Sequence, residues 1–395
     1  AHTVLGPVCQ ATDWNQAGNL NAYVGVKAFV WRGRRYEGIA GAVCGCDPLA
    51  WGQIATYHAL NHGTPSAAWD PGEEAGYVLY NGETVARQTL PGAFDWEAVR
   101  DQTRLTLADG SQDIPVARLM WNLGVVGHGE YGADAGTAAT VGVESFRDYF
   151  GFGDGLFYQK PQANGEVLPY WREALWRILR CSLQAEAPLG VGIYTAEGAG
   201  HMAVIDGWGV DAEGKAWFHV DKGWGSANPA NAWWDLDEAW GEIRHLYANV
   251  FPEDLGSLVV GRVTDAAFAP LAGASVVLAD AAGAAIREAT TDEAGCYVFR
   301  NLPRVDASAY VDPGQAVPTA AYTVTVSAPG FVGASRTVAV EAFVDETARQ
   351  EKHEAWEDKG KPSEGGAAQA LFQEAYGGAV ADFALEGVAL RAAPS

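Results

Sequence analysis

The apolar pattern of the first 250 residues predicts helices followed by a sheet. In residues 168–185 (LPYWREALWRILRCSLQA), Leu, Trp and Ile recur three and four positions apart, which is the period of an amphipathic helix. Short apolar runs typical of strands come next, separated by turn sequences such as DAEGK, at 189–194, 201–208 and 216–221. Helices that precede an antiparallel sheet indicate an α+β domain, which we place at residues 1–254.

The pattern changes at about Gly256. Short β-rich runs bounded by Gly, Pro, Asp or Asn follow one another: GSLVVGRVTD, GASVVLAD, AIREATTD, GCYVFRNL and YTVTVSAPG. Regular short strands at this spacing predict a small all-β sandwich, which we place at residues 255–345.

Residues 346–395 differ again in composition. The stretch that begins at Asp345 is charged and contains Gly, Ser and Pro, which is typical of a linker or mobile tail. Its last part carries large apolar residues, so it could also dock as a helix or a strand on either domain; they are Leu371, Phe372, Tyr376, Phe383 and Leu385.

Composition and charge exclude several classes of function. Of the 395 residues, 48% are hydrophobic and 15 are Trp, which is ample for a large core. The formal net charge of −23 argues against nucleic acid and anionic membranes as partners, because both require a basic surface. No run of about 18 apolar residues exists, so we expect no membrane span.

The five cysteines are too few for a disulfide-stapled scaffold, and their odd number leaves at least one thiol free. Zinc binding by Cys44 and Cys46 is poorly supported, because no second Cys or His pair has the matching spacing; we expect no metal and no cofactor. The chain begins AHTVLGPV, without Met or a leader pattern. Either a signal and a pro-segment have been removed, or the sequence simply starts there.

Cys46 is the candidate nucleophile. Gly45 and Pro48 suit the start of a helix, and the residues from Leu49 onward have helical apolar spacing. A thiol at a helix N-terminus lies at the positive end of the helix dipole, which favours the thiolate. The alternative is a small buried hydrophobic residue, as most free cysteines are.

A nucleophilic thiol needs a base, and His201 fits best because it stands at the start of an apolar strand after glycines, with Gly200 leaving room for a substrate backbone. His58 lies twelve residues along the same predicted helix, too far to reach Cys46. His219 is a rival base of lower rank. A structural role for His201 is the alternative.

Three further residues complete a possible acyl-transfer site. Asp221, at a strand end, can accept the imidazole N–H, and Trp224 can cover that pair. The Cys46 backbone N–H and the side-chain amide of Gln16 can stabilise an oxyanion. Taken singly, Asp221 would be a turn residue and Gln16 a surface residue.

Five segments in this order resemble the streptopain family of secreted bacterial cysteine proteases, within the papain-like group. They are WNQAGNLN at 14–21, GCDPLAWGQIATYH at 45–58, VARLMWNLGVVGHGEYG at 116–132, GHMAVIDGW at 200–208 and FHVDKGWG at 218–225. The resemblance implies a papain-like fold, Cys46 as nucleophile, His201 as base and Gln16 in the oxyanion hole. It gives Gln53, Tyr57 and His58 structural roles.

Several positions depart from the family pattern. Asp221 stands where the family has Asn, and Lys222 stands where it has Trp. Asp47 and Pro48 replace small apolar residues. A carboxylate at Asp47 would oppose thiolate formation and could favour basic substrate side chains. A Cys44–Cys46 disulfide would silence the site reversibly.

The 255–345 segment resembles carboxypeptidase-regulatory-like or transthyretin-like β-sandwiches, through GRVTD, PLAGASVVL, TDEAGCYVFRNL and YTVTVSAPGF. Together the resemblances imply a secreted, extracellular bacterial cysteine endopeptidase that acts on proteins or peptides and has its own pro-segment. The alternatives are a protease-fold protein that has lost activity and serves in binding or adhesion, and a transpeptidase or amidase using the same thiol and imidazole.

Overall fold

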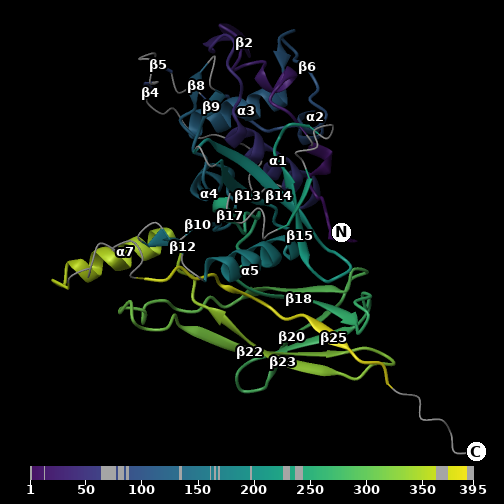
Figure 1. The fold of residues 1–395 in the computed structure, drawn as a ribbon. Helices are drawn as coiled ribbons and strands as arrows, with labels where there is room; N and C mark the ends of the chain where they lie inside the picture. Colours follow the sequence, from purple (N-terminus) through teal and green to yellow (C-terminus); the bar gives the residue numbers. More distant parts are fainter. Residues whose placement is uncertain are drawn as a thin grey trace, which may run out of the picture.

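The computed structural model describes residues 2–12, 14–63, 77–78, 84–85, 89–132, 136–160, 162–163, 166–167, 170–195, 198–225, 232–235, 243–361 and 372–388. Figure 1 shows three layers: N-terminal helices and hairpins at the top, an antiparallel sheet in the middle and β-rich elements below. None of the helices within these ranges has the length and apolar character needed to cross a membrane.

Helix α1 (Cys46–Asn61) is the centre of the N-terminal part and is buried from Asp47 to His58. A helix that is buried on all sides must be surrounded by other parts of the protein. Here α3 (Pro115–Val126) packs against it, and the sheet lies on another side. Around them lie the 3-10 turns Gln10–Thr12 and Gly18–Asn21, the helices α2 (Trp96–Arg100) and α4 (Val143–Phe150), and the hairpin strands β2 (Ala28–Trp31), β3 (Arg34–Glu37), β4 (Tyr77–Val78), β5 (Thr84–Val85), β6 (Leu105–Thr106), β7 (Gln112–Asp113), β8 (Glu130–Gly132) and β9 (Gly136–Ala138).

The antiparallel sheet has the order β10-β17-β13-β14-β15-β16, with β1 paired to β14. Its strands are β1 (His2–Leu5), β10 (Leu156–Gln159), β13 (Leu189–Tyr194), β14 (Gly200–Val210), β15 (Ala216–Asp221), β16 (Ala232–Asp235) and β17 (Ile243–Ala248). A separate two-stranded ladder joins β11 (Gln162–Ala163) to β12 (Glu166–Val167).

Helix α5 (Trp171–Gln184) covers the face of the sheet opposite to α1. Alternate residues of β14 divide between the two sides: Met202 and Val204 join the core around α1, whereas Ala203 and Ile205 join the core around α5. The predicted helix at 168–185 and the three predicted strands are therefore confirmed. The predicted order of helices before the sheet holds only in part, because β1 precedes every helix and β10 precedes α5.

The β-rich module begins at β18 (Ser257–Asp265) and has two sheets around one core. One sheet runs β20-β19-β22-β23, from β19 (Ser275–Ala279), β20 (Ala285–Thr290), β22 (Thr319–Ser327) and β23 (Ala334–Glu341); the other pairs β18 with β21 (Cys296–Leu302). Asp265, Asp280 and Asp292 each accept backbone N–H groups two and four residues on, which fixes the turns between strands.

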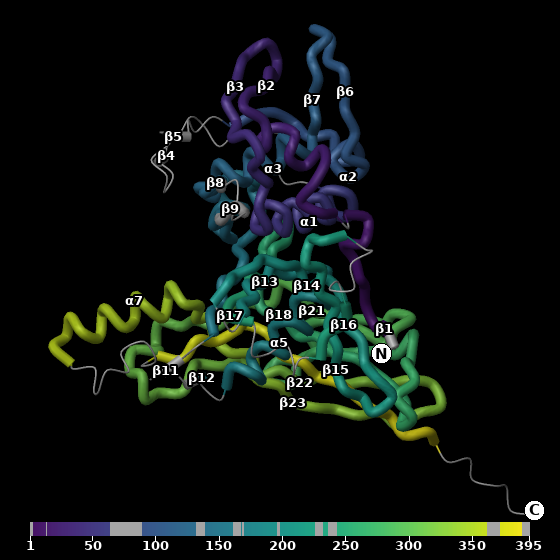
Figure 2. The backbone as a smooth tube through the Cα atoms, turned by 45° about the horizontal axis from the view of Figure 1, so that its top comes forward, coloured from purple at the N-terminus to yellow at the C-terminus, as the bar shows by residue number. Residues whose placement is uncertain are grey.

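The C-terminal segment departs from the predicted linker or mobile tail. Helix α7 (Glu346–Glu357) starts at Asp345, whose carboxylate accepts the N–H of Ala348 at 2.8 Å. Further on, β24 (Gly378–Val380) and β25 (Phe383–Leu385) both pair in parallel with β18. These strands, drawn in yellow in Figure 2, extend the sheet of β18 and β21, and β24 also packs against α5. The tail therefore docks as strands, the alternative that the sequence left open.

Candidate active site

Cys46 is the first residue of α1, as expected. The residue before it, Gly45, is buried and adopts φ 95° and ψ 154°, a conformation that side chains with a Cβ rarely take. This glycine turns the chain sharply into the helix. The backbone N–H of Met202 points at the Cys46 sulfur, with an N–Sγ distance of 3.3 Å, so the thiol lies beside the start of β14.

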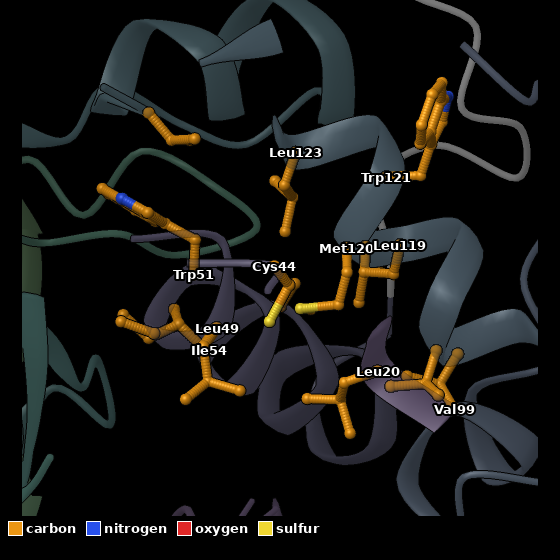
Figure 3. Close-up of a cluster of buried hydrophobic side chains, with 14 of the residues drawn as sticks. Leu20, Cys44, Leu49, Trp51, Ile54, Val99, Leu119, Met120, Trp121 and Leu123 are labelled. Atoms are coloured by element: carbon orange, nitrogen blue, oxygen red, sulfur yellow. The ribbon is translucent and has the colours of Figure 1, made fainter. Parts of the chain in front are cut away.

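Cys44 belongs to the core and not to the site. It is fully buried, and Figure 3 shows its sulfur among Leu49, Met120 and Leu123. Burial raises the pKa of Cys44 to about 12. All five cysteines are free, so the structure contains no Cys44–Cys46 disulfide.

His201 is the second residue of β14 and is half-buried. Its Nε2 atom lies 2.8 Å from the backbone carbonyl oxygen of Lys222. A carbonyl oxygen only accepts hydrogen bonds, so Nε2 carries the proton and Nδ1 is left as the basic nitrogen. The Trp224 indole lies 5.1 Å from the imidazole, centroid to centroid, so it is next to the ring, although the predicted Asp221–His201 pair does not form.

Asp221 does not occupy the predicted position as acceptor for His201, because the Lys222 carbonyl takes that place. The Asp221 carboxylate accepts instead from Gln53 Nε2 at 2.7 Å and from the Gly223 N–H at 2.7 Å. The reason is strand register. Asp221 pairs with Val204, whose side chain faces α1, so the carboxylate also points toward α1 and meets Gln53.

Gln16, Cys46, Gly200 and His201 line one cavity of about 660 Å³. The segment that carries Gln16 is held beside Trp224: Asn15 pairs with Trp224 in an isolated bridge, and Gly225 N–H donates to the Trp14 carbonyl at 3.1 Å. Sequence reasoning missed the aromatic part of the cavity lining, which comes from the three strands β10, β13 and β17; the residues are Phe157, Tyr194, His245 and Tyr247. The alternation of His245 and Tyr247 along a strand was the available signal.

Burial dominates the electrostatics of the thiol and the imidazole. It raises the pKa of Cys46; the Met202 N–H opposes this rise, and Asp47 adds to it. Burial lowers the pKa of His201, while the Lys222 carbonyl opposes the drop. An isolated thiolate and an isolated imidazolium are therefore both unfavourable, and the two charges are best formed together, by proton transfer between the groups.

Asp47 lines the same cavity but is itself buried. Burial raises the pKa of its carboxyl group well above the usual value, and Val141 N–H donates to its Oδ1 at 3.2 Å. The Asp47 carboxylate also raises the pKa of Cys46, in line with the expectation that it opposes thiolate formation. Within the described residues, no group of three or more His, Cys, Asp or Glu side chains could hold a metal ion.

Cysteine peptidases need a thiol and an imidazole that share one site, and this fold brings them to one cavity from α1 and β14. The sequence profile of the Peptidase C10 family matches residues 14–234, which is more than half of the chain. The chain therefore belongs to the Peptidase C10 family, the streptopain family of cysteine peptidases. A carboxypeptidase regulatory-like domain matches residues 259–312, within the β-rich module.

No curated protein matches the chain. Among solved structures, Klebsiella pneumoniae 5-hydroxyisourate hydrolase is 18% identical over 22% of this chain and 78% of its own, with a TM-score of 0.16. The Bacillus anthracis TIE protein is 13% identical over 60% of this chain and 34% of its own, with a TM-score of 0.20. Likenesses at these TM-scores carry no conclusion about fold or function.

Proposed function

We propose that this protein is a papain-like cysteine endopeptidase in which Cys46 attacks a peptide carbonyl and His201 moves the proton. The observation that carries the proposal is the Met202 N–H bonded to the Cys46 sulfur, because it fixes the thiol against β14, next to His201. Family membership supports the peptidase class.

In the acylation step, the thiol proton passes to His201 Nδ1 while a bond forms between the Cys46 sulfur and the carbonyl carbon. The Cys46 N–H and the Gln16 amide stabilise the oxyanion. His201 then gives the proton to the leaving amine as the C–N bond breaks, which leaves a thioester. The Lys222 carbonyl holds the ring in the tautomer that this transfer needs.

In the deacylation step, His201 takes a proton from a water molecule as its oxygen attacks the thioester carbon. The C–S bond breaks, and the thiolate recovers the proton from the imidazolium. Trp224 lies over the ring and limits access of bulk water, although 43% of the Trp224 surface stays exposed.

The test compares hydrolysis of an unfolded protein substrate under reducing conditions by the wild type, Cys46→Ala and Cys296→Ala. Cys296 lies in the β-rich module and serves as the matched control. We expect Cys46→Ala to lose essentially all cleavage and Cys296→Ala to keep it. Equal cleavage by the wild type and Cys46→Ala would overturn the proposal.

Alkylation by iodoacetamide at pH 6 separates an active peptidase from a protein that has kept only the fold. Mass mapping should show Cys46 modified far faster than the buried Cys9 and Cys181, and His201→Ala should abolish the difference. We further propose that the protein is secreted, that it acts on extracellular proteins and that it is made with its own pro-segment. The resemblance to streptopain-like proteases supports these proposals. Export of a tagged full-length precursor tests both.

A further inference from the structure

We propose that Gln53 is a positioning residue whose buried amide holds together helix α1 with Cys46, the segment before Gln16 and the turn whose Lys222 carbonyl orients His201. The inference rests on the proposed function, because it concerns the alignment of those groups. Gln53 lies on α1, seven residues or about two helical turns beyond Cys46, and is fully buried. It lies outside the cavity, so it acts through other groups.

The hydrogen bonds of the amide define its role. Gln53 Nε2 donates to the Thr12 carbonyl at 2.5 Å and to Asp221 Oδ2 at 2.7 Å. A primary amide nitrogen has two protons, and both are used. The Oε1 atom has no hydrogen-bond partner within the described residues, so the two acceptors alone orient this side chain.

The hydrogen bond from Gln53 to Asp221 supports the position of His201. The Asp221 carboxylate that accepts from Gln53 also accepts the N–H of Gly223 at 2.7 Å. The hydrogen bond between Asp221 and Gly223 encloses Lys222, whose carbonyl oxygen accepts from His201 Nε2. A shift of Asp221 would therefore move the carbonyl that sets the tautomer and the plane of the imidazole.

The hydrogen bond from Gln53 to the Thr12 carbonyl supports the position of Gln16. The Thr12 carbonyl accepts from Gln53 and also from the Trp14 N–H, at 2.7 Å. The Trp14 carbonyl in turn accepts from Gly225, in the same turn that follows Asp221. The amide thus closes a loop of contacts that joins α1, the N-terminal segment and the 221–225 turn beneath the cavity.

The experiment is a double-mutant cycle with Gln53→Glu, Asp221→Asn and the double variant. Gln53→Glu sets two carboxyl groups against each other, and Asp221→Asn sets two amide donors against each other. In the double variant, Asn at 221 can donate to Glu at 53 and still accept from Gly223. The hydrogen bond from residue 53 to the Thr12 carbonyl is also missing in the double variant.

The primary readout is the pH titration of the His201 imidazole by NMR, which needs no turnover; the second is the rate of Cys46 alkylation at pH 6. We expect each single variant to shift the His201 titration and to slow alkylation about tenfold or more, the effect of losing one hydrogen bond to a charged group. The double variant should recover most of both.

Gln184→Glu is the matched control, since Gln184 is another buried glutamine, on α5, bonded to Arg180 and to the Gly261 carbonyl. It should leave both readouts unchanged. If Gln53→Glu does not fold, Gln53→Met removes the donor without adding charge and should shift both readouts in the same direction.

The inference is overturned if the His201 titration is unchanged in the single variants, or if the double variant is as impaired as the two singles combined. Failure of the proposed function would be recognised separately, in the wild type. The wild type would then show no fast-reacting Cys46 and no cleavage, whatever the His201 titration does.

Discussion

At the scale of single residues, His58 shows how α1 depends on buried polar groups. Its ring is fully buried and packs 5.0 Å from Tyr57, 5.6 Å from Phe152 and 5.2 Å from Phe251. Burial lowers the pKa of His58 to about 3, and nearby His62 adds to the effect. His58 is therefore neutral in the folded protein at every pH at which the protein is expected to work.

This burial predicts acid lability. Between pH 6.5 and 3 the unfolded chain binds a proton at His58 and the folded chain does not. The contribution of His58 to the free energy of unfolding is therefore constant above pH 6.5 and decreases progressively as the pH falls from 6.5 to 3. From pH 7.5 to 4.5, the free energy of unfolding of the wild type should fall by roughly 3 kcal/mol more than that of His58→Phe.

Urea denaturation of both proteins at the two pH values measures this difference. Any packing cost of the larger Phe ring cancels, because it is present at both pH values. Equal pH dependence in the two proteins would contradict the neutral, buried state of His58.

At the scale of elements, the site depends on how closely α1 approaches the turn after β15. Gly223 in that turn has φ +69°, and a Cβ there would lie 2.1 Å from Leu49 Cδ2 on α1. Only a residue without a side chain allows this contact. The Lys222 carbonyl that accepts from His201 belongs to the residue just before Gly223, so we expect this close approach to hold that carbonyl in place.

Gly223→Ala should therefore slow Cys46 alkylation and lower the free energy of unfolding by about 2 kcal/mol or more, from backbone strain and the clash together. Leu49→Ala removes the clashing methyl groups, so the double variant should alkylate faster than Gly223→Ala alone, although it stays less stable than the wild type. Rate measurements at pH 6 and urea denaturation record the two effects.

The control for backbone strain is Gly214→Ala, with φ +81° and only one atom near its Cβ position, at 4.0 Å. It should lose stability but keep the alkylation rate. An unchanged rate in Gly223→Ala would show that the turn adapts without moving the imidazole.

At the scale of the whole molecule, the C-terminal segment joins the peptidase part to the β-rich module. Arg180 on α5 is nearly buried and makes two hydrogen bonds to Asp382, at 2.9 and 3.1 Å. Its guanidinium carbon lies 3.8 Å from the centre of the Trp208 ring. Tyr376 is fully buried and donates to Asn249 Oδ1 at 2.8 Å. These contacts tie the two parts into one body.

Asp382→Ala should lower the free energy of unfolding by about 1–3 kcal/mol, because it leaves the Arg180 guanidinium without its carboxylate. Scanning calorimetry should show the wild type unfolding in one transition and the variant earlier, with the two parts beginning to separate. Glu386→Ala removes an exposed carboxylate four residues further along the same tail and should change little. Equal losses in both variants would contradict the role of the Arg180–Asp382 pair.

The sequence sufficed for elements whose pattern is local. The amphipathic period of α5, the apolar runs of β13, β14 and β15, and the Asp-containing turns of the β-rich module depend on neighbouring residues, and the structure contains them. The same holds for Cys46 at the start of a helix. Helix α7 was missed because its charged composition outweighed the capping signal of Asp345.

Contacts between distant residues could not be predicted in this way. The acceptor for His201 is a backbone carbonyl, and every residue has one, so no residue type marks it. Asp221 had the right chemistry for that role, but strand register turned its carboxylate toward Gln53, which is 168 positions away. The one polar residue in an apolar stretch of α1 was a signal for Gln53, without any indication of its partners.

The sequence by itself determined which groups are available: a thiol after a helix-starting glycine, an imidazole at a strand start and an acidic, aromatic-rich chain. Tertiary structure alone decided which groups meet, because register and helix packing set the direction of each side chain. It also shifted the pKa values, since burial raises the pKa of Cys46 and lowers that of His201, and burial is a property of the folded molecule as a whole.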